Sequence, residues 1–490
     1  MKFFFTAILF LILPFTQLLS QSNYVGSGIA LSFDGSTGNY ADLDDVYNDL
    51  AFPLTFEAWV NPADYESPYS AVFASDNNSS GSYYGFYIRF DNAGKLIFEI
   101  GTGSGAGETS RNGRMTTTVV LTNEWTHIAV VANSASDVGF YFNGVEQPTT
   151  YSDGDGSASS LIHNSNHAAI GRQTTPFDTH NFIGEIDEVR LWDISRTESE
   201  IQTNMCKKLS GVESGLIGYW IVDESYSDLS LIDQSSTGND GTLYGDMDRI
   251  TSGAPIGNES IYVYTDSWTG LSLTLNSLGG DKLSILKIAN NPHGVHVYRV
   301  DDYPYNTDGL DEAYTPYYYG VFSADDLTDV KYGLIYKYSF SNGVVNEYNE
   351  SDAFLYERFD GAEESWSNLF ALQNFSANKL VKKTNVNRKE IIFGIDYQHG
   401  TKGLEEPGTL DFLNVYPNPT SDNIYLELND ENALPYSYIL YDVTGRIVYS
   451  KNEVSNLKEG INVQNLADGI YLLSIQHEDQ FYNKKIIVQK

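Results

Sequence analysis

The chain has 490 residues, of which 41% are hydrophobic and 14% aromatic, and its formal net charge is -36. This hydrophobic content supplies packed cores for about three domains, which excludes a chain that is disordered throughout. Such an acidic surface repels phosphate backbones and excludes nucleic acid as a partner, while the single cysteine, Cys206, excludes an intrachain disulfide and a cysteine-based metal site.

The first 20 residues have the pattern of a signal peptide. Lys2 supplies a positive charge, an apolar run covers residues 3–13, and Ser20 is a small residue at the expected cleavage point. The apolar run is too short to span a membrane, and no later run approaches the ~18 residues that a membrane helix needs. We therefore expect an exported chain with no transmembrane segment after cleavage.

Residues 25–248 are predicted to form one large β domain. Alternating apolar and polar residues, typical of half-buried strands, occur at 54–60, 86–90, 95–100, 126–131 and 139–142. One helix is expected, over residues 197–208, with Ser195 or Thr197 as its N-cap.

A second β-sandwich domain, to which the sequence assigns no function, is expected over residues 258–397. A linker at 398–410 contains glycines and a proline, and a third domain follows at 411–490. Within the second domain, Tyr317–Tyr319 fit either an exposed contact surface or alternating core residues. The sequence thus predicts an all-β chain of three units.

The third domain carries the most specific motifs. Two prolines open it, glycines mark two later turns, and a pair of lysines precedes its last strand. The residues that carry the pattern are Pro417, Asn418, Pro419, Asp442, Gly445, Arg446, Gly469, Tyr471, Lys484 and Lys485.

In this order, these motifs resemble the type IX secretion sorting domain, also called the Por secretion tail, which implies a small Ig-like sandwich. The resemblance implies that the type IX outer-membrane secretion machinery handles the chain. It also implies a destination outside the cell or on the outer surface of a Gram-negative bacterium. A sorting domain specifies where the protein goes and not what it binds.

The first domain contains a second series of motifs, at residues 30–35 (ALSFDG), 54–60 (LTFEAWV), 124–129 (EWTHIA), 140–144 (FYFNG), 169–172 (AIGR) and 182–192 (FIGEIDEVRLW). This series resembles the laminin G-like domain of the concanavalin A-like jelly-roll superfamily. Many relatives close this domain with a disulfide that the present chain cannot form, so core packing must hold the two sheets together. Trp59, Trp125 and Trp192 are expected to be core anchors rather than sugar-stacking platforms.

The resemblance also implies a Ca²⁺ site near Asp34 and Asp187, because relatives hold Ca²⁺ at a sheet edge with carboxylates and carbonyls. The alternative is structural: Asp34 caps the turn at Gly35, and Asp187 accepts hydrogen bonds from nearby backbone N–H groups. The glycine-rich stretch with Asp153 and Asp155 lacks the spacing of an EF-hand and is a candidate ligand-binding rim loop.

Catalytic motifs are not found in the sequence. Residues 185–188 (EIDE) come nearest to the paired carboxylates of jelly-roll glycosidases, but their spacing is wrong. We therefore expect no catalytic residues and a secreted or cell-surface binding or adhesion protein that recognises an extracellular glycan or protein. The alternatives are a polysaccharide-degrading hydrolase, its accessory carbohydrate-binding subunit, or a structural surface protein in which the middle domain provides reach.

Overall fold

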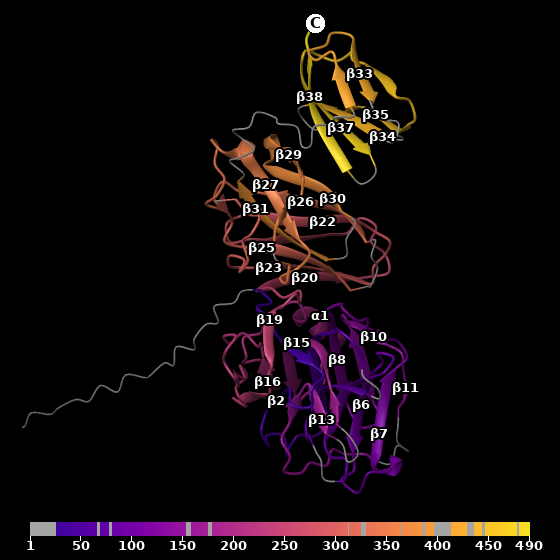
Figure 1. Cartoon of the computed structure of the whole chain (residues 1–490), viewed down its shortest axis with the longest axis vertical. Helices are drawn as coiled ribbons and strands as arrows, with labels where there is room; N and C mark the ends of the chain where they lie inside the picture. The colour runs from indigo at the N-terminus through magenta and orange to yellow at the C-terminus, as the bar shows by residue number, and fades with distance from the viewer. Residues whose placement is uncertain are drawn as a thin grey trace, which may run out of the picture.

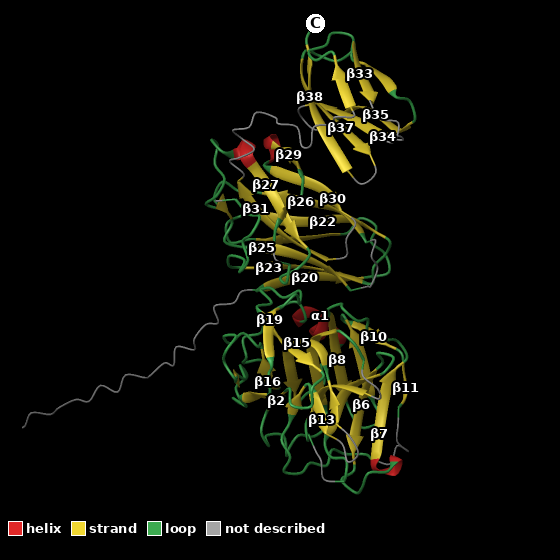
Figure 2. Ribbon diagram, viewed as in Figure 1, coloured by secondary structure: helices red, strands yellow, loops and turns green. Residues whose placement is uncertain are grey.

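The computed structural model describes residues 26–65, 69–77, 81–152, 158–174, 179–311, 313–324, 330–363, 365–384, 388–395, 413–428, 436–442, 446–477 and 480–490. The expected signal peptide, the rim loop with Asp153 and Asp155, and the linker at 398–410 lie outside these ranges. Figure 1 shows three β units along the long axis, and Figure 2 shows strands throughout with only short helices. The predicted all-β fold class is confirmed.

The first unit is a sandwich of an eight-stranded and a nine-stranded sheet, both antiparallel. The eight-stranded sheet runs β10 (Val145–Gln147), β9 (Val138–Phe142), β8 (Thr126–Ala132), β3 (Leu54–Pro62), β15 (Ile183–Trp192), β1 (Ile29–Asp34) and β19 (Asp248–Thr251), with β16 (Leu216–Trp220) paired to β15. The nine-stranded sheet runs β11 (Thr149–Tyr151), β7 (Arg111–Thr116), β6 (Leu96–Gly101), β5 (Phe86–Asp91), β4 (Tyr69–Ala74), β12 (Ala169–Ile170), β2 (Tyr40–Asp42), β18 (Gly241–Tyr244) and β17 (Ser230–Leu231).

Alternation along each strand separates the core from the outer faces of this sandwich. In β5, Phe86, Ile88 and Phe90 join the buried cluster between the two sheets, whereas Tyr87 and Arg89 point to the outer face. A separate hairpin, β13 (Arg172–Thr174) and β14 (Thr179–Asn181), packs against the outer side of β4. Apolar packing therefore holds the two sheets without a disulfide, because the single cysteine, Cys206, is buried and free.

A helix is present within the predicted range as α1 (Glu198–Asn204), and a capping box fixes where it begins; it ends at Asn204, before the predicted end at residue 208. The Thr197 hydroxyl accepts from the backbone N–H of Glu200, and the Glu200 carboxylate accepts from the backbone N–H of Thr197. Ile201 on α1 packs against Ala129 and Val131 of β8, so the helix covers the outer face of the eight-stranded sheet. Short 3-10 turns occur at Glu108–Ser110, Glu350–Asp352 and Phe375–Ala377.

The second unit is a sandwich of a seven-stranded and a five-stranded sheet. The larger sheet runs β20 (Glu259–Tyr264), β23 (Gly294–Val300), β25 (Tyr318–Ser323), β31 (Arg388–Ile395), β27 (Ala353–Arg358) and β28 (Ser367–Asn368), with β24 (Ala313–Tyr314) paired to β31. The smaller sheet runs β21 (Ser272–Asn276), β22 (Lys282–Ala289), β26 (Lys331–Lys337), β30 (Lys379–Thr384) and β29 (Leu372–Asn374).

The three consecutive tyrosines of the second unit are buried and offer no exposed contact surface. Tyr317 and Tyr319 lie in the core between the two sheets, and Tyr318 lies in a second cluster shared with the first unit. The buried carboxylate of Asp281 accepts hydrogen bonds from the Tyr317 hydroxyl at 2.9 Å and the Tyr336 hydroxyl at 2.6 Å. Burial raises the pKa of Asp281. Because Tyr317, Tyr318 and Tyr319 are all buried, their role is in packing.

The first two units share one continuous hydrophobic cluster. The Trp59 ring of β3 meets the Phe322 ring of β25 edge to face, with centroids 5.4 Å apart. Across the same junction, Asn143 donates to the carbonyl of Ala324 at 3.2 Å, and the Tyr264 hydroxyl donates to the carbonyl of Asn143 at 2.6 Å. In Figure 1, α1 lies at the end of the first unit that faces β20. The second unit is therefore attached to the first by a shared apolar cluster and by hydrogen bonds, in addition to the chain that joins them.

His296 lies at this junction and is fully buried. Its ring nitrogens lie 3.0 Å from the Tyr264 hydroxyl and 3.3 Å from the Ser260 hydroxyl. Burial lowers the pKa of His296 from 6.5 to about 3. As the pH falls below 6.5, the unfolded chain takes up this proton first, so the free energy of unfolding decreases by up to about 1.4 kcal/mol per pH unit until the folded pKa is reached.

We expect the variant His296→Gln to lose this pH dependence. Urea unfolding at about pH 7.5 and about pH 5.5 should show the wild type losing about 1.4 kcal/mol more than the variant. Buried carboxylates such as Asp187 have a raised pKa, so their effect on stability has the opposite sign and favours folding at lower pH. Their contribution is the same in the wild type and in the variant, and it cancels in the comparison. Equal losses in the two proteins would contradict the prediction.

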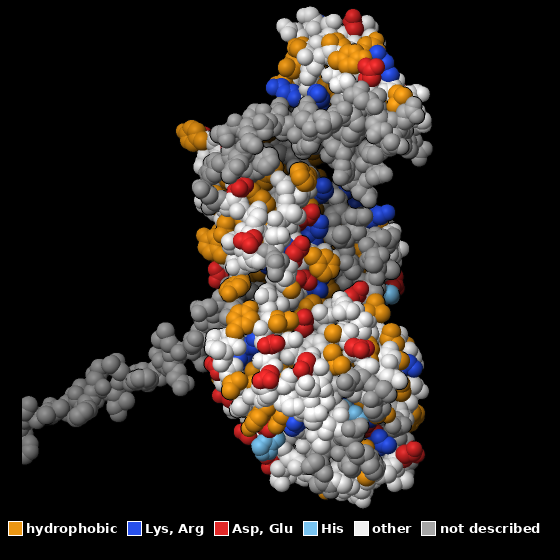
Figure 3. Space-filling model, in the orientation of Figure 1, with side chains coloured by type: hydrophobic (Ala, Val, Ile, Leu, Met, Phe, Trp, Pro, Cys, Tyr) orange, Lys and Arg blue, Asp and Glu red, His pale blue; other side chains and the backbone are white. Residues whose placement is uncertain are grey.

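The third unit is a small sandwich of seven strands. One sheet runs β32 (Leu413–Tyr416), β33 (Asn423–Leu428) and β36 (Lys458–Asn462); the other runs β35 (Ile447–Val454), β34 (Tyr436–Asp442), β37 (Gly469–His477) and β38 (Gln480–Val488). Its buried cluster is separate from those of the other units. On the face drawn in Figure 3, acidic side chains of the first two units are spread over the surface rather than gathered in one patch.

Candidate functional site

The two outer faces of the first unit differ in how far they are covered. On the eight-stranded sheet, the segment around α1 covers β3, β8 and β15: the Trp59 indole donates to the carbonyl of Met205 at 2.7 Å, and Arg190 donates to the carbonyl of Asn204 at 3.0 Å. In addition, Phe322 of the second unit packs against the Trp59 ring. In the described part of the chain, neither α1 nor the second unit covers the outer face of the nine-stranded sheet in the same way.

The centre of that face is filled by a buried ionic network. Arg89 of β5 is bonded to Glu99 of β6, and its other terminal nitrogen donates to Gln173 of β13 at 3.1 Å. Arg111 lies 3.3 Å from the second oxygen of Glu99, and the Tyr69 ring lies 3.8 Å from the Arg89 guanidinium. Arg89, Glu99 and Gln173 are all buried, so this network supports the hairpin above it and does not face solvent.

The edge of the face formed by β2 and β18 is open. Tyr40 and Tyr244 are paired across these strands, and their rings stack with centroids 5.1 Å apart and planes 10° apart. The Arg172 guanidinium lies 3.1 Å from the centroid of the Tyr40 ring. Arg172, Tyr40 and Tyr244 together form what we call the tyrosine stack, and Tyr244 remains 47% exposed. An open aromatic ring in a fixed orientation is suited to stacking against a sugar.

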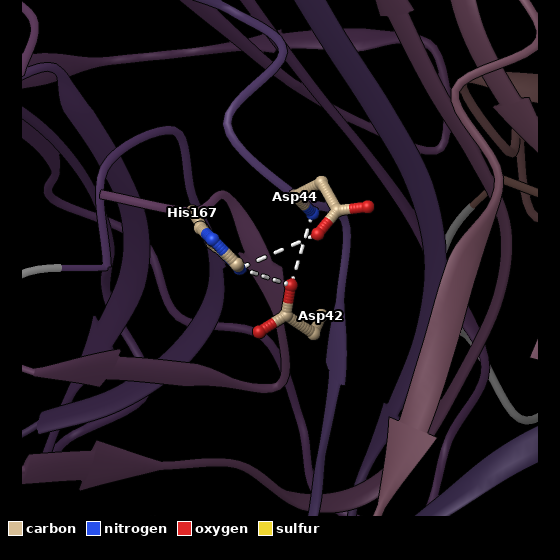
Figure 4. A group of neighbouring side chains, drawn as sticks. All are labelled: Asp42, Asp44 and His167. Atoms are coloured by element: carbon tan, nitrogen blue, oxygen red, sulfur yellow. Dashed lines mark hydrogen bonds and ion pairs between the residues drawn. The ribbon is translucent and has the colours of Figure 1, made fainter. Parts of the chain in front are cut away.

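A group of metal-ligand type lies at the edge of the tyrosine stack. Asp42 follows Tyr40 by two residues in β2 and so points to the same face. The Nδ1 atom of His167 lies 2.8 Å from Asp42 Oδ1 and 3.6 Å from Asp44 Oδ1. Figure 4 shows the two carboxylates and the imidazole directed toward one another. No local motif predicts this group, because Asp42 and His167 are distant in the sequence and meet only when β2 pairs with β12.

Asp34, one of the two expected Ca²⁺ ligands, caps a turn. Its carboxylate accepts from the backbone N–H and the hydroxyl of Ser36, both at 2.8 Å, and from the Asn39 amide at 2.9 Å. The hydrogen bonds from Ser36 lower the pKa of Asp34. Gly35 adopts a φ of 82° in this turn, a conformation that favours glycine.

Asp187, the other expected ligand, is buried elsewhere. Its carboxylate accepts from the Ser252 hydroxyl at 2.6 Å and the backbone N–H of Glu188 at 2.7 Å. Burial, followed by the neighbouring Glu188 carboxylate, raises the pKa of Asp187 well above its usual range. Asp34 pairs with Ile183, so the two carboxylates are about four residues, or ~13 Å, apart along the paired strands and do not share a position for one ion. A Ca²⁺ ion at either residue remains a prediction.

The tryptophans expected as core anchors are buried, but none of the three lies between the two sheets. Trp59, Trp125 and Trp192 belong to clusters on the outer side of the eight-stranded sheet, and Trp59 and Trp125 are part of the junction with the second unit.

A bulge in β15 gives Glu188 a φ of 51° and places its carboxylate 2.7 Å from Arg190. Simple alternation along the strand therefore fails for residues 187–190.

A groove of about 460 Å³ lies where the first two units meet. Residues 117–121 and the β9–β10 hairpin form one wall, and His293 and Ala324 of the second unit complete it. The described residues of its lining offer hydroxyl, amide, imidazole and apolar groups, and none of them is a carboxylate, lysine or arginine. These groups do not indicate any particular class of ligand. The candidate site is therefore the tyrosine stack on the nine-stranded sheet and not this groove.

The residues of the expected sorting signal have structural roles in the third unit. Asn418 donates to the carbonyl of Lys485 at 2.7 Å and accepts from the backbone N–H of Ile487 at 2.8 Å, which holds the segment from Pro417 to Pro419 against β38. Lys484 and Lys485 lie on that strand, opposite Leu473 and Leu472.

Two further positions of this signal stabilise turns. Asp442 accepts from the backbone N–H of Arg446 at 3.1 Å and from its guanidinium at 3.0 Å, whereas Gly445 lies outside the described residues. Gly469 begins β37, and Tyr471 on that strand donates to the carbonyl of Ala467 at 3.0 Å. The recognition of these residues by the export machinery stays a prediction.

Two family models match the chain. Residues 34–202 match the concanavalin A-like lectin/glucanases superfamily, and residues 414–489 match the secretion system C-terminal sorting domain. The chain therefore carries a concanavalin A-like domain of the laminin G type and a C-terminal sorting domain, as the sequence predicted. The sorting domain indicates export by type IX secretion to the cell surface or beyond. No helix among the described residues is long and apolar enough to cross a membrane.

A search of curated proteins found no match. Among solved structures, a putative carbohydrate binding protein from Bacteroides ovatus is 21% identical, with a TM-score of 0.33, over 48% of this chain and 61% of that chain. A SAP-like pentraxin from Limulus polyphemus is 15% identical over 36% and 81%, with a TM-score of 0.25. The CBM40 of Ruminococcus gnavus IT-sialidase, bound to α2,3-sialyllactose, is 12% identical over 36% and 97%, with a TM-score of 0.28. Similarity at this level does not extend to the ligand.

Proposed function

We propose that this protein is exported to the outer surface of a Gram-negative bacterium and binds an extracellular glycan through the tyrosine stack on the nine-stranded sheet. The observation that carries the proposal is the open Tyr244 ring. It stacks on Tyr40, which in turn contacts Arg172, on the outer face that, among the described residues, neither α1 nor the second unit covers. Membership of a superfamily of lectins and glucanases supports a sugar as the ligand.

Three described carboxylates, Glu99, Asp187 and Glu188, fit binding better than hydrolysis. A glycosidase needs one protonated and one ionised carboxyl group at the sugar. At the centre of the outer face, both oxygens of Glu99 are engaged by Arg89 and Arg111. Asp187 and Glu188 are buried beneath the outer surface of the opposite sheet. The hydrolase alternative is tested by measuring whether new reducing ends appear when the protein is incubated with the glycans that it binds.

We expect Tyr244→Ala to weaken glycan binding by about tenfold, because it removes the open ring and the stacking contact that this ring provides. A glycan array identifies ligands for the full chain, and calorimetry with those ligands measures the loss.

The matched control is Tyr151→Ala. Tyr151 is 65% exposed and has an arginine, Arg114, 3.8 Å from its ring centroid, but it lies on β11 at the opposite edge of the same sheet. This control should bind like the wild type. Loss of binding in Tyr151→Ala alone would move the site to that edge and contradict the proposal. A protein ligand, the other candidate, would give no signal on the array for any variant.

A further inference from the structure

We propose that Asp42, Asp44 and His167 bind one divalent transition-metal ion of the Zn²⁺ class at the edge of the tyrosine stack. Each side chain offers one ligand atom, and these atoms lie within 4.8 Å of one another. The ligands of a tetrahedral ion with bonds of ~2.1 Å are about 3.4 Å apart. The distances of 2.8 Å and 3.6 Å from His167 Nδ1 to the two carboxylates bracket that value, so small rotations suffice to admit an ion.

The backbone holds the three residues in place before any ion binds. Leu43, between the two aspartates, donates to the carbonyl of Ala168 at 2.9 Å, and Ala168 donates back to the carbonyl of Asp44 at 2.9 Å. The carbonyl of His167 accepts from the backbone N–H of Asn77 at 2.7 Å. Prior fixing of the ligands reduces the entropy that ion binding would otherwise cost.

The ligand set selects the kind of ion. Ca²⁺ and Mg²⁺ prefer oxygen ligands alone, whereas an imidazole nitrogen combined with carboxylates suits Zn²⁺ and related metals. This group is thus separate in place and in chemistry from the Ca²⁺ expected near Asp34 and Asp187. The two aspartates also bring two negative charges together, which a dication neutralises.

The tyrosine stack lies next to the three ligands, on the same pair of strands, but none of its residues is a ligand of the ion. Asp42 is two residues from Tyr40 in β2, and Thr242, the residue opposite Asp42, is two residues from Tyr244 in β18. The side chains of His167 and Asp44 are 49% and 75% exposed, so a bound ion keeps an open position toward solvent. A hydroxyl of a sugar on Tyr244 can fill that position; this last step rests on the proposed function.

Calorimetric titration of the EDTA-treated full chain, without an affinity tag of histidines, tests the inference with ZnCl₂ alone. We expect one ion per chain and binding at least about tenfold weaker in His167→Gln and Asp42→Asn. The matched control is Asp45→Asn, which removes the same charge one residue beyond Asp44 and should bind like the wild type. Asp44→Asn serves as a further variant because Asp44 has a φ of 59°, which asparagine tolerates.

Two results would overturn the inference: unchanged Zn²⁺ binding in His167→Gln and Asp44→Asn, or an equal loss in Asp45→Asn, which would indicate attraction by general acidity. Melting temperatures of the metal-free variants verify that each is folded. The glycan array, run separately, keeps the two proposals apart. Zn²⁺ binding without any glycan signal contradicts only the proposed function, and a glycan signal without specific Zn²⁺ binding contradicts only the metal site.

Discussion

A chain that ends at residue 409 is expected to accumulate in the periplasm instead of reaching the cell surface. The truncation removes the whole sorting domain, whose family model covers residues 414–489. The third unit has its own buried cluster, so the first two units should fold without it. The expected change is from nearly complete export to nearly none, measured by fractionating cells and probing the surface with protease.

The closing strand of the third unit offers a sharper test than deletion. Thr420 accepts from the backbone N–H of Gln489 and donates to the carbonyl of Ile487, both at 2.9 Å, while Asn418 fastens the proline segment to the same strand. Lys484→Gln with Lys485→Gln keeps these backbone bonds and changes only charge. Loss of export in this variant would assign recognition to the lysines, and retained export would assign it to the shape of the unit. Normal surface display of the truncated chain would contradict the sorting role altogether.

Local sequence signals predicted much of this fold. Thr197 and Glu200 stand at the spacing of a capping box, so the beginning of α1 follows from the four residues 197–200. The all-β class was also predicted correctly, and so were the families of the first domain and of the C-terminal domain. These features depend on short-range alternation and on motifs that are contiguous in the chain.

The candidate site could not be predicted in the same way, because its parts come together through pairing of distant strands. Tyr40 and Tyr244 are far apart in sequence and meet because β2 pairs with β18. Likewise, Asp42 reaches His167 through the pairing of β2 with β12. Alternation indicates which residues share a face of one strand but not which strand lies beside it. The bulge at Glu188 shows that even alternation within a strand can fail.

The burial of Trp59 is the feature of the structure that most constrains where a ligand can bind. An aromatic residue in a jelly-roll strand could have been a sugar platform, but this ring is fully buried between the first unit, the segment after α1 and Phe322 of the second unit. The middle unit therefore packs directly against the first unit and covers the part of its outer face around Trp59. The tyrosine stack on the opposite sheet remains open.

Trp59→Ala is expected to lower the free energy of unfolding by about 4 kcal/mol, because it leaves a large cavity in the shared cluster. It also removes the donor to the carbonyl of Met205 and the edge-to-face contacts with His127 and Phe322. Trp59→Phe keeps most of the contact area and should lose about 1 kcal/mol with the hydrogen bond. Urea unfolding followed by tryptophan fluorescence and circular dichroism measures both losses.

The matched control for this loss is Tyr348→Ala, which removes an aromatic side chain that is 87% exposed and should leave stability unchanged. If the shared cluster couples the two units, Trp59→Ala should also separate their unfolding into two transitions and speed proteolysis near Gly257, where the two units are joined. A loss below about 1 kcal/mol, with a single transition kept, would show that Trp59 does not hold the units together. Glycan binding at Tyr244 should survive in the folded variant, because the tyrosine stack lies on the other sheet.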